Sequence, residues 1–287
     1  MPTLYEEVRA ALREMDLRPK KSRGQNFLIH ERVIDAMLEL LDLASEDEVV
    51  EVGAGLGFLT RRLLERANKV CAIEVDSELV ERLRKNAWAG APKLELIHGD
   101  ILEVDLPALL PARKIKLAGN LPYRIATAVL FRIFEWREHF SSLVVMVQKE
   151  VADRMVATAG TKDYGALSVW CRLHGRITDK ISVSPEAFFP RPKVRSTALR
   201  MELFSEPLIV EAEMAPLRGL VRAAFGQRRK MLANALGGWL GLARKEIDNF
   251  LASHHVDPRR RGETLSVEEF IALARAARAQ GLPIVEG

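Results

Sequence analysis

The stretch VVEVGAGLGFLTRRLLE, residues 49–65, constrains the fold most, because a β-rich run, a glycine loop and a helix follow one another directly. Gly53, Gly55 and Gly57 lack the Cβ atoms that would keep a ligand away from the backbone. The helix expected from about Phe58 points its free amides into the loop. In an open α/β sheet this loop lies in the crevice where ligands bind. We therefore predict an α/β protein with a binding site here.

Strand-like and helix-like runs alternate as far as residue 204. Apolar residues follow helical spacing at 5–16, 31–43 and 77–88, and β-rich runs lie at 47–53, 69–76, 93–100, 114–120 and 141–149. Such alternation indicates βαβ units and a parallel sheet. The runs near 175–183 and 196–203 are adjacent in sequence, which suggests an antiparallel edge. Only helical periods follow, so we predict an α/β domain over 1–204 and a small all-helical domain over 205–287.

The spacing of the glycines narrows the choice of ligand. Phe58 occupies the place of the third glycine of a dinucleotide site, which argues against NAD or FAD. No Gly-Lys-Ser/Thr follows, so the loop is not of the Walker type. A glycine triplet alone also fits a plain tight turn between a strand and a helix. The residues downstream must decide between a turn and a site.

Two carboxylates close the next two strands, Glu74 in CAIEVD and Asp100 in LIHGD. The two oxygens of Glu74 match the vicinal hydroxyls of a ribose, and Asp100 can accept an amino proton from adenine. Either residue alone fits a helix N-cap or a solvated turn. Together, after a glycine loop, they favour a nucleoside, whose α-amino group Glu51 could reach. A nucleoside that carries an amino acid in place of phosphates is S-adenosylmethionine, and we expect this cofactor.

The tetrapeptide NLPY, residues 120–123, follows the fourth strand at the same rim. An exocyclic adenine nitrogen is a poor nucleophile, because its lone pair is delocalised into the ring. Hydrogen bonds from its N–H groups to the Asn120 side-chain oxygen and the Leu121 carbonyl would localise that lone pair. Pro122 ends regular pairing and so exposes the Leu121 carbonyl, and Tyr123 offers a ring for stacking. The alternative is a proline turn with a capping Asn and a core Tyr.

A second aromatic stretch, AFFPRPKVRS at 187–196, joins rings to basic residues. Phe188 could cover the other face of the base, and Arg191 and Lys193 could contact phosphates. A rigid loop between edge strands is the alternative.

Basic residues elsewhere gather in three places, within a formal net charge of +4. We expect them to form a phosphate track whose affinity falls as salt rises, although charge runs are usually solvated surface. Besides the stretch PRRRGE at 258–263, the candidates are Lys20, Lys21, Arg23, Arg222, Arg228, Arg229 and Lys230.

The remaining composition excludes several classes of protein. The two cysteines, Cys71 and Cys171, lie in apolar segments, which suggests buried reduced thiols, a cytoplasmic chain and no metal cluster. The N-terminus has no apolar core of signal-peptide type. No apolar run approaches the ~20 residues that span a bilayer, so we expect no membrane partner.

In order and spacing, the motifs resemble those of the ribosomal small-subunit adenine dimethyltransferases over nearly the whole chain. The resemblance implies a Rossmann-like methyltransferase domain followed by a helical domain that grips rRNA. It also implies transfer of two methyl groups from S-adenosylmethionine to N6 of each of two adjacent adenosines, in a hairpin loop near the 3′ end of small-subunit rRNA. The matching motifs are GQNFL (24–28), EVGAGLGFLT (51–60), IEVD (73–76), GD (99–100), NLPY (120–123), QKEVADRM (148–155), YGALSV (164–169), FFPRPKV (188–194) and RRKML (228–232).

Carried over by position, the resemblance assigns roles to individual residues. The implied partner is an immature small ribosomal subunit, and we expect a monomer. Three departures, at Arg124, Ala126 and Arg195, are expected to tune contacts rather than abolish chemistry. The implied cofactor contacts are Asn26, Leu28, Gly53, Glu74, Asp100 and Asn120, with Gln25 beside them, and the implied base contacts are Asn120, Leu121, Tyr123 and Phe188.

Three other functions stay open. A non-catalytic RNA-binding assembly factor could keep this fold, but it need not keep Asn120 and Glu74. A related branch methylates large-subunit rRNA and confers antibiotic resistance, and it usually carries Lys where Leu56 stands here. An enzyme acting on DNA adenine could share the NLPY chemistry, although GQNFL and the helical C-terminal region resemble the rRNA enzymes.

Overall fold

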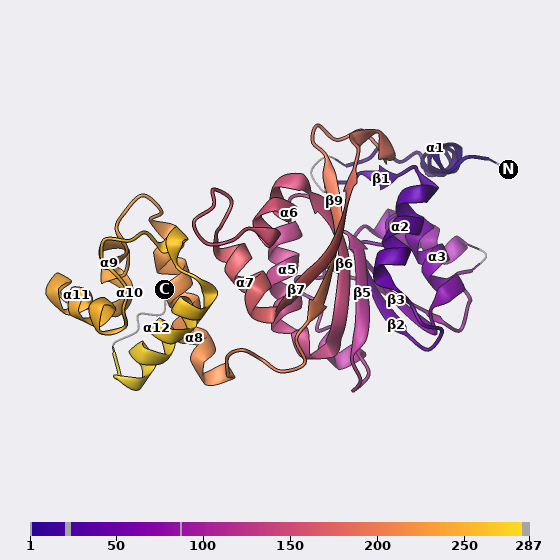
Figure 1. Ribbon diagram of the computed structural model, residues 1–287. Coiled ribbons are helices and arrows are strands. Elements are labelled where there is room, and N and C mark those ends of the chain that lie inside the picture. Colours follow the sequence, from indigo (N-terminus) through magenta and orange to yellow (C-terminus); the bar gives the residue numbers. More distant parts are fainter. Residues whose placement is uncertain (1, 21–23, 87, 283–287) are drawn as a thin grey trace. The chain divides into compact units, whose positions relative to one another are not determined.

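The computed structural model describes residues 2–20, 24–86 and 88–282 (Figure 1). The chain divides into two compact units. The first comprises residues 1–152 and 175–205, and the second comprises 153–174 and 206–287.

The first unit is built on one seven-stranded sheet in the order β4-β3-β2-β5-β6-β9-β7. Five neighbouring strands, β4 to β6 in that order, are parallel. Strand β9 is antiparallel to both of its neighbours, β6 and β7, which confirms the predicted antiparallel edge. The strands are β2 (Glu48–Val52), β3 (Lys69–Glu74), β4 (Leu94–His98), β5 (Ile115–Asn120), β6 (Phe140–Gln148), β7 (Gly175–Val183) and β9 (Ser196–Leu203).

The strand order places a switch point between β2 and β5. From β2 the chain moves outward through β3 to β4, then returns to the other side of β2 and adds β5 and β6. Connections leave the carboxyl ends of β2 and β5 in opposite directions, which opens a crevice there. The helices of this unit are α1 (Leu4–Glu14), α2 (Glu31–Leu41), α3 (Phe58–Arg66), α4 (Ser77–Lys85) and α5 (Ala126–Glu135), with short 3₁₀ turns at Pro107–Leu109, Arg137–His139 and Pro185–Ala187.

Local chemistry explains where the crevice helices start. Gly57 precedes α3 with a φ of 84°, a left-handed conformation that glycine adopts without strain. Asp76 caps α4 by accepting a hydrogen bond from the Glu78 amide, as N-cap aspartates do. Apolar residues of α2 and α3, such as Met37 and Leu63, pack in one core cluster with the sheet. The crevice therefore rests on rigid elements.

A two-stranded antiparallel sheet joins the N-terminal segment to the loop before β9. Its strands are β1 (Phe27–Leu28) and β8 (Phe188–Phe189), and it pairs Leu28 with Phe188. The GQNFL and FFPRPKV motifs, far apart in sequence, are thus neighbours.

The second unit is helical. It takes in α7 (Ala166–His174), which the predicted boundary at 204/205 assigned to the first domain. Tyr164 ties this segment to the C-terminal region: its hydroxyl donates to the Leu265 carbonyl at 2.9 Å, and its ring packs edge-on against Phe225. The other helices are α8 (Glu211–Gly226), α9 (Leu232–Ala235), α10 (Gly237–Leu240), α11 (Arg244–Ser253) and α12 (Val267–Ala279), with a 3₁₀ turn at Gly262–Thr264, while α6 (Lys149–Val156) spans the crossing between units.

In the part of the chain that the structure describes, no helix has the length and apolar character that a bilayer-spanning segment requires. The same residues contain no group of three or more His, Cys, Asp or Glu side chains that could hold a metal ion.

Candidate active site

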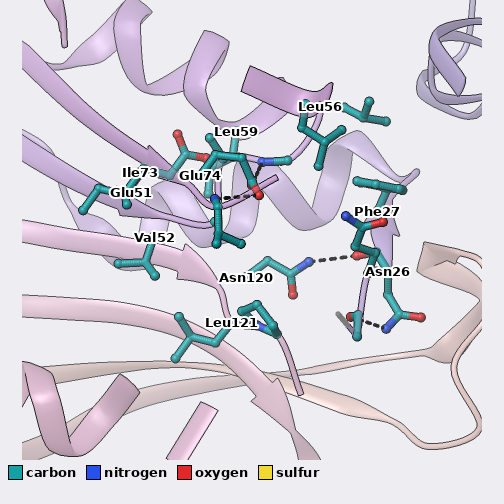
Figure 2. Close-up of a pocket in the computed structure, with 18 of the residues that line it drawn as sticks. Asn26, Phe27, Glu51, Val52, Leu56, Leu59, Ile73, Glu74, Asn120 and Leu121 are labelled. Atoms are coloured by element: carbon teal, nitrogen blue, oxygen red, sulfur yellow. Dashed lines mark hydrogen bonds between the residues drawn. The ribbon is translucent and has the colours of Figure 1, made fainter. Parts of the chain in front are cut away.

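A pocket opens at the carboxyl ends of β2, β3 and β5, at the switch point of the sheet (Figure 2). Its open space is about 1100 Å³ with the solvent at its mouth included, enough for a nucleoside-sized ligand. Five segments line it: 24–28, 51–56, 73–75, 99–101 and 120–123. They bring together every residue predicted to contact the cofactor, and also Leu121 and Tyr123.

The glycine loop forms one wall of the pocket. Gly53, Gly55 and Gly57 have φ angles of 78°, 59° and 84°. A side chain at any of them would be strained. A Cβ on Gly53 would point toward the rim, 3.8 Å from the Asn120 carbonyl oxygen. The backbone itself therefore forms this wall of the pocket, and no side chain of these three residues stands in front of it.

Glu74 holds the loops around it. Its Oε2 accepts from the Gly55 amide at 2.8 Å, and its Oε1 accepts from the amides of Val75 and Asp76 at 3.0 and 2.9 Å. Burial raises the pKa of this carboxyl, although these three amides favour its charged form. The helix cap is Asp76, so the capping alternative for Glu74 is excluded.

Asp100 uses one of its two carboxylate oxygens in a hydrogen bond within the chain. Its Oδ1 accepts from the Leu102 amide at 2.9 Å, which makes the tight turn after β4. Its other oxygen has no partner within the described chain, and the residue lines the pocket. The turn alternative is thus correct for one oxygen, and the second can accept a ligand proton.

Glu51, which the sequence suggested could reach the α-amino group of the ligand, lines the pocket from β2. Its side chain is 1% exposed, and its Oε2 has no hydrogen-bond partner among the described residues. Burial raises the pKa of Glu51 to about 8. The nearby Thr60 hydroxyl opposes this shift, yet its oxygen makes no hydrogen bond of normal geometry. A buried, unpaired acceptor that lines a pocket fits a cationic or N–H donor from a ligand.

The orientation of the Asn120 amide follows from its neighbour. Its Nδ2 donates to the Asn26 backbone carbonyl at 3.0 Å, shown as a dashed line in Figure 2. A carbonyl can only accept, so the nitrogen must face Asn26 and the oxygen is left for another donor. The Asn26 side chain donates in turn to the Gly24 carbonyl at 3.0 Å.

The Gln25 side chain links the Lys20 backbone to Asp76, a role that the sequence did not predict. Its Oε1 accepts from the Lys20 amide at 2.8 Å, and its Nε2 donates to Asp76 at 3.0 Å. The side chain of Lys20 pairs with Asp76 and Glu78 at 3.2 and 3.0 Å. The residue that could have suggested this role is Asp76. A carboxylate can only accept hydrogen bonds, so when it is buried it needs donors from elsewhere in the chain.

The two aromatic residues predicted to hold a base differ in the structure. Tyr123 lines the pocket and is half-buried, and its hydroxyl lies 2.6 Å from Ser196 Oγ. Phe188 is 2% exposed and packs in the core. Stacking needs an open ring face, so the structure does not support the predicted stacking role of Phe188. The pairing of β8 with β1 turns this ring inward, while Phe189 lies on the opposite face and contacts Tyr5.

The predicted phosphate contacts fall into two groups. Lys20, Arg191 and Arg228 are held by partners: Lys20 as above, Arg191 by Glu186, and Arg228 by the carbonyls of Lys162 and Tyr164 and by Glu263. Within 258–263, Arg260 likewise pairs with Glu269. Lys21 and Arg23 lie outside the described residues. Of the predicted phosphate contacts, Lys193, Arg222, Arg229 and Lys230 are exposed and have no ion pair in the described chain.

Comparison with known proteins gives a consistent result. Residues 17–277 match the sequence model of the family described as ribosomal RNA adenine dimethylase. Similar proteins include two named ribosomal RNA small subunit methyltransferase A. One, from Geobacter metallireducens, is 43% identical over 274 residues (94% of this chain, 99% of the relative). The other, from Desulfitobacterium hafniense, is 44% identical over 256 residues (89% and 91%).

Solved structures extend this likeness to the fold. A dimethyladenosine transferase from Plasmodium falciparum superposes with a TM-score of 0.73 at 25% identity, covering 89% of this chain and 98% of the other. The 23S rRNA methyltransferase ErmE gives 0.64 at 25% identity, covering 88% and 99%. The first unit has the Rossmann-like methyltransferase fold, and helices follow it. The chain belongs to the ribosomal RNA adenine dimethylase family.

Proposed function

We propose that this protein dimethylates N6 of two adjacent adenosines in a 3′-terminal hairpin loop of small-subunit rRNA, with S-adenosylmethionine as the methyl donor. The observation that carries this proposal is the Asn120 amide, whose nitrogen is committed to Asn26 so that its oxygen can accept at the rim. The names of the relatives, which are 38–44% identical, support the small-subunit substrate.

The pocket residues fit this cofactor. When bound, it supplies a methyl group on a positively charged sulfur. Glu51, buried and unpaired, would receive the ammonium group of the amino-acid end. The one acceptor site that Glu74 keeps free, on Oε2, would accept a ribose hydroxyl. The unused oxygen of Asp100 would accept an adenine amino proton. Gly53, Asn26 and Leu28 would contact it along the loop and the facing segment.

The acceptor site follows from two groups at the end of β5. The Asn120 oxygen would accept one N–H of the target amine. The Leu121 carbonyl, which no described backbone amide uses because Pro122 follows, would accept the other. Two acceptors draw the nitrogen toward tetrahedral geometry and localise its lone pair. Positioning of this kind can contribute roughly 7–11 kcal/mol in favourable systems, and the surplus proton is lost to water after transfer.

Recognition of rRNA is assigned to the second unit and to exposed cations. Arg222, Arg229 and Lys230 are exposed there without an ion pair among the described residues, and Lys193 is exposed in the first unit. Such residues bind phosphates with affinity that falls as salt rises. An adenosine in a loop can be turned out of its stack at modest cost. We propose that the protein acts as a monomer, in the cytoplasm, on immature small subunits.

The test is to incubate the protein with labelled donor and small subunits isolated without these methyl groups, then map the modified nucleotides. We expect two dimethylated adenosines in one small-subunit hairpin loop, and none with Asn120→Ala of unchanged thermal stability. Label found only in large-subunit rRNA, or full activity of Asn120→Ala, would refute the proposal.

A further inference from the structure

The hydroxyl of Tyr123 is joined to Ser196, the last residue of the stretch 187–196, to which the sequence assigned no role. Its oxygen lies 2.6 Å from Ser196 Oγ, a short and therefore strong hydrogen bond. Ser196 has no exposed surface, whereas Tyr123 is half-buried and lines the pocket. The bond thus connects a ring at the pocket wall to an immobile part of the sheet.

Topology shows how far this bond reaches. Tyr123 lies just beyond the end of β5, and Ser196 is the first residue of β9. Strand β6 lies between these two strands in the sheet. Neighbouring strands are about 4.8 Å apart, so the ring must cross roughly 10 Å over the carboxyl end of β6. Ser196 is itself paired with Gln148 of β6 and Val183 of β7. Both ends of the Tyr123 side chain are therefore fixed.

A ring held only at its Cα can rotate about χ1 and leave the position it occupies. A ring that is also held at its hydroxyl keeps the same tilt whether or not a base lies beside it. Stacking on a flipped base requires such an orientation, because the base makes few other contacts once it has left its neighbours. The hydroxyl of Tyr123 lies at the end of the ring remote from the backbone, where one bond restrains it best.

We infer that Ser196 is a positioning residue for base binding: through the Tyr123 hydroxyl it keeps the ring aligned for stacking with the target adenine. This inference rests on the proposed function, because it needs a base in the pocket. It goes beyond the NLPY motif in assigning part of the acceptor site to β9. The serine does not touch the substrate, so its whole effect passes through Tyr123.

The test is a double-mutant cycle on Ser196→Ala and Tyr123→Phe, measured as kcat/KM for unmethylated small subunits and as the Kd for S-adenosylmethionine. One hydrogen bond is worth about 0.5–1.5 kcal/mol, so each single variant should lose about two- to tenfold in kcat/KM. The double variant should lose no more than either single variant, because all three lack the same bond. The Kd of the cofactor should not change.

Two controls separate alignment from folding. Thr197→Val removes a hydroxyl from the next residue of β9, whose side chain lies on the opposite face of the strand; kcat/KM should be unaffected. Tyr123→Phe takes this partner from the buried Ser196 hydroxyl, whereas Ser196→Ala takes it from the half-buried Tyr123 hydroxyl. A loss of kcat/KM that both variants share therefore reports the bond and not the desolvation of one group. A hairpin with 2-aminopurine at the target position gives a readout without turnover, and the fluorescence of its complex should be higher for both variants, because stacking quenches it.

The outcomes are distinct. Additive losses in the double variant, or wild-type fluorescence and kcat/KM in Ser196→Ala, would overturn the inference. A lower melting temperature with unchanged kcat/KM and fluorescence would also overturn it, because the bond would then serve only the fold. If the wild-type protein failed to methylate small-subunit rRNA at all, the proposed function would fail first, irrespective of Ser196.

Discussion

Replacing Glu51 by Gln should alter how stability depends on pH. Glutamate has a pKa near 4.5 when exposed, and burial raises the pKa of Glu51 to about 8. The folded state therefore binds a proton that the unfolded state releases between these values. Stability from this group is complete below pH 4.5 and is lost as pH rises through 8, at about 1.4 kcal/mol per pH unit in between. Gln cannot ionise and lacks this slope.

Unfolding curves of Glu51→Gln and of the wild type at several pH values are enough to test this expectation. In urea titrations followed by circular dichroism, the stability of Glu51→Gln relative to the wild type should rise by about 3 kcal/mol from pH 5.5 to 7.5, which is two units of this slope. Glu81→Gln, on an exposed position of α4, is the matched control and should run parallel to the wild type. Parallel profiles for Glu51→Gln and the wild type would refute the reasoning.

The same carboxyl gives a second measurement in the wild type. A cationic ligand group beside Glu51 favours its charged form, so cofactor binding near neutral pH should release a proton. Calorimetry in buffers of different ionisation enthalpy detects this release. It should disappear in Glu51→Gln, and a wild-type protein that releases no proton would argue against an ammonium contact there.

Three further changes test how the site is built. Gly119→Ala places a Cβ 2.7 Å from the Val52 carbonyl oxygen, so β5 must shift. We expect a stability loss of about 1–3 kcal/mol and at least tenfold lower activity. Gly90→Ala is the control and should have no effect, because its Cβ meets nothing within 4 Å. Gln25→Leu removes the hydrogen bond to Asp76. It should raise the Kd of the cofactor and lower kcat, while RNA affinity measured by filter binding should not change. Arg228→Met should lower the melting temperature because it frees two carbonyls and Glu263, whereas Arg229→Met should leave it unchanged and reduce the salt slope of RNA binding by about one.

The sequence predicted the pocket well because its parts are strand ends. Parallel strands bring their carboxyl ends to one edge, so Gly53, Glu74, Asp100 and Asn120 could be placed together without knowledge of any contact. The hydrogen-bond partners could not be foreseen in the same way. Asn26 lies 94 residues from Asn120, and no local pattern shows that its carbonyl would fix an amide so distant in sequence.

The aromatic and basic residues show where pattern reading fails. Phe188 and Phe189 are adjacent on one strand, so they face opposite sides, and only the pairing with β1 decides which ring is buried. The sequence likewise gives no means of telling which of the neighbouring Arg228 and Arg229 is held by other residues and which is free to bind RNA. Arg228 pairs with Glu263 and donates to the Tyr164 carbonyl. Through contacts of this kind, residues 153–174 belong to the helical unit.

The carbonyl of Asn26 also limits what residue 120 can be. Aspartate has nearly the shape of asparagine and could accept a proton from the target amine equally well. In this chain, however, its second oxygen would face the Asn26 carbonyl at about the same 3.0 Å, lone pair against lone pair. The choice of amide over acid is thus imposed by the N-terminal segment, and not by the reaction. Because this acceptor is a backbone carbonyl, which every residue type at position 26 carries, no substitution there would make Asp acceptable at position 120. Only a different path of the N-terminal segment would do so.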